Sequence, residues 1–316
     1  MLFRSKREII LVSKDAGLRI IANSLGIKTQ DYLASKVKNP EIFSDATPKI
    51  DLTMDQINRL LADGELMLPI PDTFKINSRV VAKELNCVVV EKNKIKILNE
   101  ESVSDIKPKN LEQQHALWLL TNPNISLVAL SGNAGSGKTL LSIAAGIEQT
   151  IGKENCQYKK IVIVRPVIPV GRDIGFLPGD IGEKLEPWMR PIYDALQMVM
   201  GDMDKTKVQY LFDQGIIEVA PLPYIRGRSI HNAFIYVDET QNISKHEIKT
   251  IITRAGQKTK IVVAGDWDQI DVNFIDKHSC GLAHVINSFQ GEKMFGSCNF
   301  VKSERSELAE LATKLL

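Results

Sequence analysis

The clearest chemical signal in the sequence is a glycine-rich run that ends in a lysine and a hydroxyl residue. The residues that fit the pattern G-x-x-x-x-G-K-[ST] are Gly132, Asn133, Ala134, Gly135, Ser136, Gly137, Lys138 and Thr139. An apolar segment precedes this run and an apolar helical pattern follows it, which is the context of a phosphate-binding loop. The glycines let backbone N–H groups turn toward phosphate oxygens, while the next helix points its N-terminus at the same anion. We expect Lys138 to reach the β and γ phosphates of a nucleotide and Thr139 to be a ligand of Mg²⁺.

A phosphate-binding loop predicts an acidic strand end elsewhere in the chain, and residues 232–244 supply one. The apolar residues 234–237 are followed directly by Asp238 and Glu239. Asp238 is expected to hold the Mg²⁺ hydration shell, and Glu239 to orient or deprotonate the attacking water. A further apolar segment leads into Gly265, Asp266 and Gln269. The neutral amide of Gln269 can contact both the γ phosphate and water, so we expect it to report the nucleotide state.

Two polar residues ahead of the loop are candidates for base recognition. Asn110 and Gln113 begin a helical pattern that precedes the strand of the loop. The amide of Gln113 can pair with the edge of an adenine through two hydrogen bonds. On this interpretation the cofactors are ATP and Mg²⁺.

These residues need a sheet whose strand ends meet at one edge. Apolar segments recur at residues 126–130, 160–164, 216–220, 233–237, 260–264 and 298–301, with helical stretches between several of them. That alternation is typical of a mostly parallel sheet covered by helices on both faces, in the α/β class. We expect residues 106–316 to form one such domain.

The first third of the chain has a different pattern. Residues 1–40 predict a strand, a turn and a helix, in which Asp15 can cap the helix and Gly26 can end it. Residues 41–105 predict a mixed α+β connecting segment, with a helix over 53–64 that ends at Gly64 and two strands over 86–98 around a Lys-Asn turn. The polar residues 102–110, which include Pro108, predict a linker.

Composition excludes several classes of function. The net charge of +2 gives no argument for nucleic-acid binding from bulk charge, so any basic surface must be local. The cysteines are scattered and form no C-x-x-C pair; they are Cys87, Cys156, Cys280 and Cys298. This pattern predicts reduced thiols in a cytoplasmic protein rather than a zinc site or disulfides. The apolar runs are too short for a membrane span, and the first residues lack the apolar core of a signal peptide.

Taken together, several segments resemble the PhoH family. They are Gln113, GNAGSGKT, VRPVIPVGRDIGFLPGD (164–180), YIRGRS (224–229), VDETQN, GDWDQID and SERSELAEL (303–311). The resemblance covers roughly residues 106–316 and implies a RecA-like P-loop ATPase similar to the first motor domain of superfamily 1 helicases. It also implies single-stranded RNA as a partner, RNA unwinding in the arrangement that carries an N-terminal PIN domain, and a role for Arg305 at the nucleotide.

Residues 1–40 are similar to the final strand and helix of a PIN domain, a metal-dependent ribonuclease fold. Asp15 matches the last of the acids that such a nuclease needs, but the other acids within residues 1–40, Glu8 and Asp31, are not placed to share a metal with it. We therefore expect a PIN remnant in which nuclease activity is lost and Asp15 is a helix cap.

One motor domain normally needs a second lobe to complete its cleft. We expect a homo-oligomeric ring, for instance a hexamer, in which a neighbouring subunit supplies an arginine to the γ phosphate. The candidates are Arg165, Arg172, Arg226, Arg228, Arg254 and Arg305. The residues expected to contact RNA are Lys159, Lys160, Arg172, Arg226 and Arg228. The alternative is a nucleotide-switched ATPase that regulates assembly without unwinding.

Overall fold

A six-stranded sheet, parallel throughout, forms the centre of the protein. The computed structural model describes residues 9–44, 46–151, 156–166, 181–201 and 205–304. In spatial order, the strands are β10 (Ile217–Pro221), β9 (Lys160–Arg165), β11 (Ala233–Val237), β12 (Lys260–Gly265), β8 (Leu127–Gly132) and β13 (Phe295–Phe300). Their valine- and isoleucine-rich segments are buried on both faces, as in sheets covered on both sides. The predicted α/β class is therefore confirmed.

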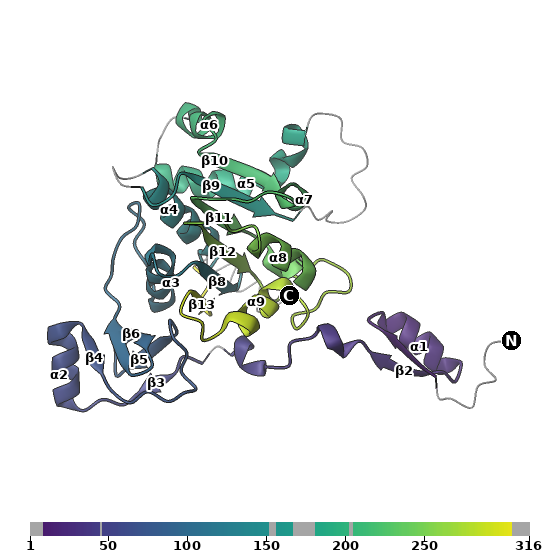
Figure 1. The fold of residues 1–316 in the computed structure, drawn as a ribbon, viewed down its shortest axis with the longest axis horizontal. Helices are drawn as coiled ribbons and strands as arrows, with labels where there is room; N and C mark the ends of the chain where they lie inside the picture. Colours follow the sequence, from purple (N-terminus) through teal and green to yellow (C-terminus); the bar gives the residue numbers. More distant parts are fainter. Residues whose placement is uncertain (1–8, 45, 152–155, 167–180, 202–204, 305–316) are drawn as a thin grey trace.

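Helices cover both faces of this sheet (Figure 1). Residues of α3 (Leu111–Thr121), α4 (Lys138–Thr150) and α5 (Ile181–Met200) share one apolar core with it. The opposite face packs against α8 (Lys245–Ile252) and α9 (Gly281–Phe289), with α7 (Leu222–Ile225) following β10 and α6 (Lys205–Asp213) preceding it. The six segments expected as strands agree with the structure, except that β13 begins at Phe295 rather than at residue 298.

A buried lysine fixes the helix that carries Gln113. The Lys260 ammonium donates to the carbonyl oxygens of Leu119, Leu120 and Asn122 at distances of 3.1, 2.6 and 2.9 Å. These carbonyls end α3, where helix carbonyls lack partners and a cation is favourable. At the other end of α3, Asn110 accepts from the backbone N–H of Gln113.

A smaller sheet forms a second unit beside α3, at the lower left of Figure 1. Its strands lie in the order β3 (Lys49–Ile50), β5 (Arg79–Ala82), β6 (Leu85–Glu91), β7 (Lys94–Ile97) and β4 (Glu65–Met67). The helix α2 (Met54–Asp63) packs on it, with a capping box from Thr53 and Gln56 and a left-handed C-cap at Gly64. The expected helix and the paired strands β6 and β7 are thus confirmed.

The segment expected as a linker is packed rather than loose. Val103 is buried in the core that α3 and α4 share with the large sheet. The Ser104 hydroxyl lies 3.1 Å from the carbonyl oxygen of Ala144 in α4. This segment therefore rests on the large sheet's helices, which the polar composition did not indicate.

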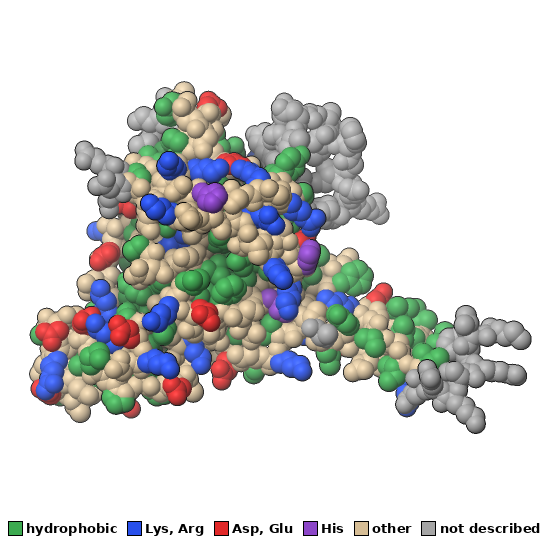
Figure 2. Space-filling view, in the orientation of Figure 1, with side chains coloured by type: hydrophobic (Ala, Val, Ile, Leu, Met, Phe, Trp, Pro, Cys, Tyr) green, Lys and Arg blue, Asp and Glu red, His purple; other side chains and the backbone are tan. Residues whose placement is uncertain are grey.

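The described N-terminal residues form a β–α–β unit that projects from the body (Figure 1). The strands β1 (Ile10–Ser13) and β2 (Lys28–Asp31) pair in parallel across α1 (Ala16–Ser24). Asp15 caps α1 by accepting from the backbone N–H of Leu18 at 3.0 Å, as expected. Figure 2 shows hydrophobic side chains, in green, gathered over this unit. The large apolar side chains that it exposes are Ile9, Ile10, Val12, Leu18, Ile20, Ile21 and Leu25.

The segment after this unit packs against the large domain. The Val37 N–H donates to the carbonyl oxygen of His278 at 2.8 Å. Phe43 lies edge-on to the rings of Trp267 and His278, with centroid distances of 5.0 and 4.9 Å. Within the described part of the chain, no helix is both long and apolar enough to cross a membrane.

Candidate functional site

The phosphate-binding motif forms the turn between β8 and α4. Gly132 has a φ of 131°, and a Cβ there would lie 2.2 Å from the carbonyl oxygen of Phe300. Gly137 has a φ of 98° and is the N-cap of α4. Only glycine satisfies both the positive φ and the close approach of β13 at Gly132. The glycines of the motif are therefore required by the turn itself.

The ammonium of Lys138 lies inside this turn. It donates to the carbonyl oxygens of Gly132 and Asn133 at 2.7 and 2.9 Å. These contacts hold the Lys138 ammonium within the loop, beside the N-terminus of α4, which favours the binding of an anion.

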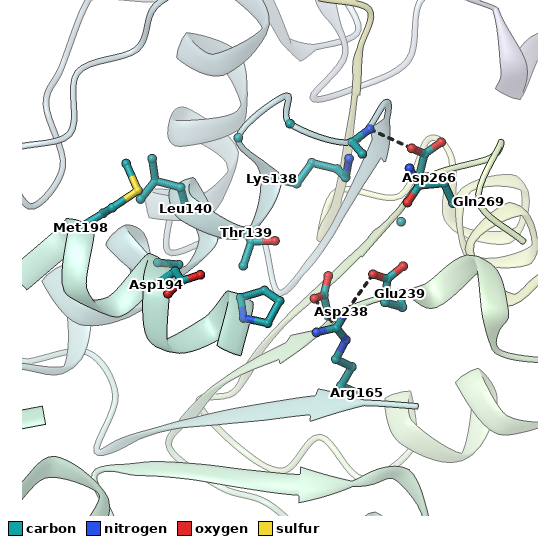
Figure 3. A pocket seen from close by; sticks show the side chains of 16 residues that line it. Lys138, Thr139, Leu140, Arg165, Asp194, Met198, Asp238, Glu239, Asp266 and Gln269 are labelled. Carbon is teal, nitrogen blue, oxygen red and sulfur yellow. Dashed lines mark hydrogen bonds and ion pairs between the residues drawn. The ribbon is translucent and has the colours of Figure 1, made fainter. Parts of the chain in front are cut away.

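The two acids at the end of β11 face different partners. Asp238 is buried, and its Oδ1 accepts from the Tyr236 hydroxyl at 2.8 Å. Glu239 has a φ of 50°, a left-handed conformation that is uncommon outside glycine and asparagine. This backbone turn separates the two carboxylates, so that Glu239 points toward the open part of the pocket (Figure 3).

Glu239 is held by a hydrogen-bond network. Arg165 Nη2 donates to Glu239 Oε1 at 3.0 Å, and Gln241 Nε2 donates to Glu239 Oε2 at 2.6 Å. Burial and the neighbouring charge of Asp238 raise the pKa of Glu239, while Gln241 and Arg165 oppose this rise. The network fixes the orientation of the Glu239 carboxylate. Its hydrogen-bond donors also compensate the partly buried negative charge for the water that it has lost.

The residues after β12 connect this network to the phosphate loop. Asp266 Oδ2 accepts from the backbone N–H of Ala134 at 2.7 Å. The backbone N–H of Asp266 in turn donates to Gln241 Oε1 at 3.1 Å. Gln269 is exposed at the same edge, and its carbonyl oxygen accepts from Gln241 at 2.9 Å. Gln241 thus joins the ends of β11 and β12.

Gln113 lies directly behind the loop. Its Nε2 donates to the carbonyl oxygen of Ser136 at 3.0 Å, and its Oε1 accepts from the backbone N–H of Lys109 at 2.8 Å. Both ends of the amide therefore contact the backbone in this structure. Its contact with an adenine remains a prediction.

These residues surround one open pocket of about 390 Å³. Of the residues predicted from sequence, those lining it are Ala134, Gly135, Gly137, Lys138, Thr139, Arg165, Asp238, Glu239, Gly265, Asp266 and Gln269. Gly132, Asn133, Ser136 and Gln113 shape or support the loop without lining the pocket. Arg305 and Arg172 lie outside the described residues.

The donor set in the pocket suits a magnesium ion carried by a nucleotide. Thr139 offers a hydroxyl, and Asp238 offers a carboxylate on the facing strand. The described residues contain no group of three or more His, Cys, Asp or Glu that could hold a metal by itself. Mg²⁺ commonly binds through one or two protein oxygens together with substrate phosphates and water. The residues present therefore fit Mg²⁺ bound with a nucleotide.

Comparison with known proteins agrees with this geometry. Residues 105–316 match the family described as PhoH-like protein. The chain is 40% identical to "Protein PhoH2" of Bacillus subtilis (strain 168), over 98% of this chain and 73% of the relative. The chain belongs to the PhoH family. The family match and the parallel sheet with its phosphate loop support a P-loop NTPase.

Other similarities to this PhoH chain cover most of its length. "Protein PhoH2" of Thermobispora bispora is 32% identical over 98% of this chain and 71% of the relative. The crystal structure of the UvsW helicase from bacteriophage T4 aligns over 90% of this chain and 77% of that one. The two sequences are 13% identical over this alignment, and the TM-score is 0.35.

Three residues that contact the acids of the site have roles that the motifs alone do not indicate. Gln241 lies within VDETQN, Tyr236 directly precedes this motif, and Arg165 is the second residue of VRPV. Arg165 was expected only as an arginine acting on a neighbouring subunit, whereas it lines its own chain's pocket. Their place beside the C-terminal ends of strands is the feature of the sequence that could have identified them.

Proposed function

We propose that this protein hydrolyses ATP with Mg²⁺ in the pocket between β8, β11 and β12. The observation that carries the proposal is the convergence of Lys138 and Thr139 with Asp238 and Glu239 on one pocket. Lys138 binds the β and γ phosphates, while Thr139 and Asp238 hold Mg²⁺, which neutralises phosphate charge when bound. Glu239 orients the attacking water and accepts its proton.

The contacts of Glu239 support this division of roles. A raised pKa makes a carboxylate a better proton acceptor, and the network of Arg165 and Gln241 aims it. Gln269 follows Asp266, which contacts the loop amide of Ala134. Because Gln269 lines the same pocket, its side-chain amide is proposed to contact the γ phosphate and the attacking water and so to report the nucleotide state.

The direct test is ATP hydrolysis by the full chain with and without single-stranded RNA. Wild-type protein should release phosphate, and Lys138→Ala should not. Equal phosphate release by wild type and Lys138→Ala would refute the proposal, because it would come from a contaminant.

We further propose that single-stranded RNA is the partner that couples to hydrolysis. Tyr224 is 54% exposed on α7, and Arg226 is exposed just after it. An exposed aromatic ring beside a guanidinium suits base stacking on single strands. Figure 2 shows Lys and Arg side chains gathered over the region of β9, β10 and α7. Lys160 and Arg228 both pair with Glu218, so Lys159 and Arg226 are the stronger candidates for phosphate contacts.

RNA binding is tested by affinity at several salt concentrations. Affinity should fall steeply as salt rises, because phosphate contacts release counterions. Tyr224→Ala and Arg226→Ala should weaken binding, whereas Tyr210→Ala should not, since that equally exposed tyrosine lies on α6. Binding that is insensitive to salt would contradict the proposal.

One observation favours the alternative of an ATPase that regulates assembly. Phe43 packs on Trp267, which follows Asp266 at the pocket edge. A change at the nucleotide can therefore reach the segment that follows the N-terminal unit through this contact. RNA stimulation of hydrolysis discriminates between the two functions, since the regulatory ATPase needs none.

The assembly and the N-terminal unit complete the proposal. We infer a cytoplasmic homo-oligomeric ring with ATP at subunit interfaces, because a single α/β domain supplies all the described residues that line this open pocket. Residues 1–40 are proposed to be the C-terminal remnant of a PIN-like domain. The parallel β–α–β arrangement supports this, and Asp15 serves there as a helix cap.

A further inference from the structure

A buried tyrosine hydroxyl joins the two residues that fit a magnesium ion. Tyr236 is fully buried on β11, two residues before Asp238. Its hydroxyl oxygen lies 3.0 Å from Thr139 Oγ1 and 2.8 Å from Asp238 Oδ1. It therefore bridges the phosphate loop and the acidic strand end.

The order of the strands explains why a bridge is needed. β12 lies between β8, which leads into the loop, and β11, which carries Asp238. Strands two places apart are separated by roughly 10 Å. A phenol is long enough to span part of this distance from β11, whereas an aliphatic side chain has no polar group to offer.

The chemistry of the hydroxyl gives the bridge a direction. One O–H group donates a single proton, and the stronger acceptor is the carboxylate of Asp238. The Tyr236 oxygen is then left to accept, so the Thr139 hydroxyl donates to it. This orientation leaves the lone pairs of Thr139 Oγ1 for a metal ion.

We propose that Tyr236 is a positioning residue, which sets Thr139 and Asp238 in place for Mg²⁺ through a Thr139-to-Tyr236-to-Asp238 hydrogen-bond relay. The proposal rests on the proposed nucleotide site. Tyr236 touches neither nucleotide nor metal, and it acts only by orienting the two groups that do.

The test is ATP binding by the full chain with and without Mg²⁺, measured by calorimetry. In wild-type protein Mg²⁺ should strengthen ATP binding. Tyr236→Phe should lose about 10- to 100-fold of this Mg²⁺-dependent gain, the usual effect of removing a group that orients a metal ligand. Its affinity for ATP without Mg²⁺ should stay within about twofold of wild type, since the phosphate loop is intact.

Tyr158→Phe is the matched control. Tyr158 is a buried tyrosine in the same core as Tyr236, and its ring packs against Phe234 at a centroid distance of 5.8 Å. It lies just before β9, at the N-terminal ends of the parallel strands, whereas the pocket lies at their C-terminal ends. It should keep the full Mg²⁺-dependent gain.

A double variant tests the relay itself. If Tyr236 acts partly through Thr139, Tyr236→Phe should cause a smaller loss of the Mg²⁺-dependent gain in Thr139→Ala than in wild type, because only Asp238 is then left for it to orient. Fully additive losses would overturn the relay. The melting midpoint checks folding, and Tyr236→Met gives the same test should Tyr236→Phe melt below the assay temperature.

These measurements test the role of Tyr236 separately from the proposed nucleotide site. An unchanged Mg²⁺-dependent gain in Tyr236→Phe, or an equal loss of affinity without Mg²⁺, would overturn the role of Tyr236 and leave the nucleotide site standing. Failure of the wild-type chain to bind ATP under any condition would instead overturn the proposed function.

Discussion

Arg165 and Glu239 form an ion pair within one chain, with Arg165 Nη2 3.0 Å from Glu239 Oε1. Arg165 ends β9 and Glu239 follows β11, and these two strands are neighbours in the sheet. Its Nε also lies 3.9 Å from Asp238 Oδ2. The guanidinium is therefore placed to hold both acids of its own pocket.

Replacing Arg165 should impair turnover more than binding. Arg165→Met removes a charge-assisted hydrogen bond from Glu239, which should lower kcat about tenfold. ATP affinity should change by less, because Arg165 contacts the acids rather than the loop. Steady-state kinetics and equilibrium binding separate the two effects. Arg59→Met is the control, since Arg59 pairs with Asp55 on α2, outside the pocket; an equal loss of kcat in that variant would contradict the role of Arg165.

Glu239→Gln should separate hydrolysis from binding. The amide cannot accept a proton from water, so kcat should fall by about 10²- to 10³-fold, as for other single electrostatic contributors. ATP binding should persist, because Lys138 and the loop amides are unchanged. Single-turnover phosphate release and nucleotide binding measure these quantities. Unchanged turnover would refute the assignment of Glu239.

Local patterns predicted the strands and the loop, but not the contacts between them. The phosphate loop needs consecutive residues, and each buried strand shows as an apolar run. Arg165, Tyr236 and Gln241 reach the site only because β9 and β12 both lie beside β11. Strand order is a property of the whole sheet, so a pattern within one segment does not reveal it.

The same reason explains what the N-terminal pattern left out. The helix cap at Asp15 is local and was predicted. The contact between Phe43 and Trp267 joins segments far apart in the chain, and neither residue has a distinctive local pattern. The left-handed backbone of Glu239 likewise depends on the surrounding contacts rather than on residue type.

The Glu218 network predicts a dependence of stability on pH. Hydrogen bonds from Arg228, and then from Lys160, outweigh burial and lower the pKa of Glu218 from about 4.5 to about 2. Because the folded pKa is depressed, this contribution to stability is present above about pH 4.5 and is lost as pH falls toward 2. The free energy of unfolding of wild type and Glu218→Gln should therefore differ most near neutral pH and converge below pH 4.5. A constant difference across this range would contradict the assignment.

The proposed homo-oligomeric ring predicts that ATPase activity depends on assembly. ATPase activity per chain should rise with protein concentration as oligomers form, measured together with mass by light scattering. Mixing Glu239→Gln chains with Arg305→Ala chains should restore part of the activity, because an intact Glu239 can then face an intact arginine of its neighbour. A monomer that hydrolyses ATP at the full rate would rule out the ring.

Phe43 should couple the N-terminal segment to the nucleotide. Its ring packs edge-on against Trp267, whose neighbour Asp266 holds the phosphate loop through Ala134. Phe43→Ala should lower the free energy of unfolding by about 1–2 kcal/mol through lost aromatic contact. Trp267 then loses an aromatic packing partner, and the neighbouring Asp266 is held less firmly against the phosphate loop. ATP affinity should therefore also weaken severalfold. Phe274→Ala is the matched control, since Phe274 follows Trp267 closely in the sequence but its side chain is 65% exposed. Chemical denaturation and ATP titration test both effects, and a loss of stability with unchanged ATP affinity would show that the contact anchors the segment without reporting to the pocket.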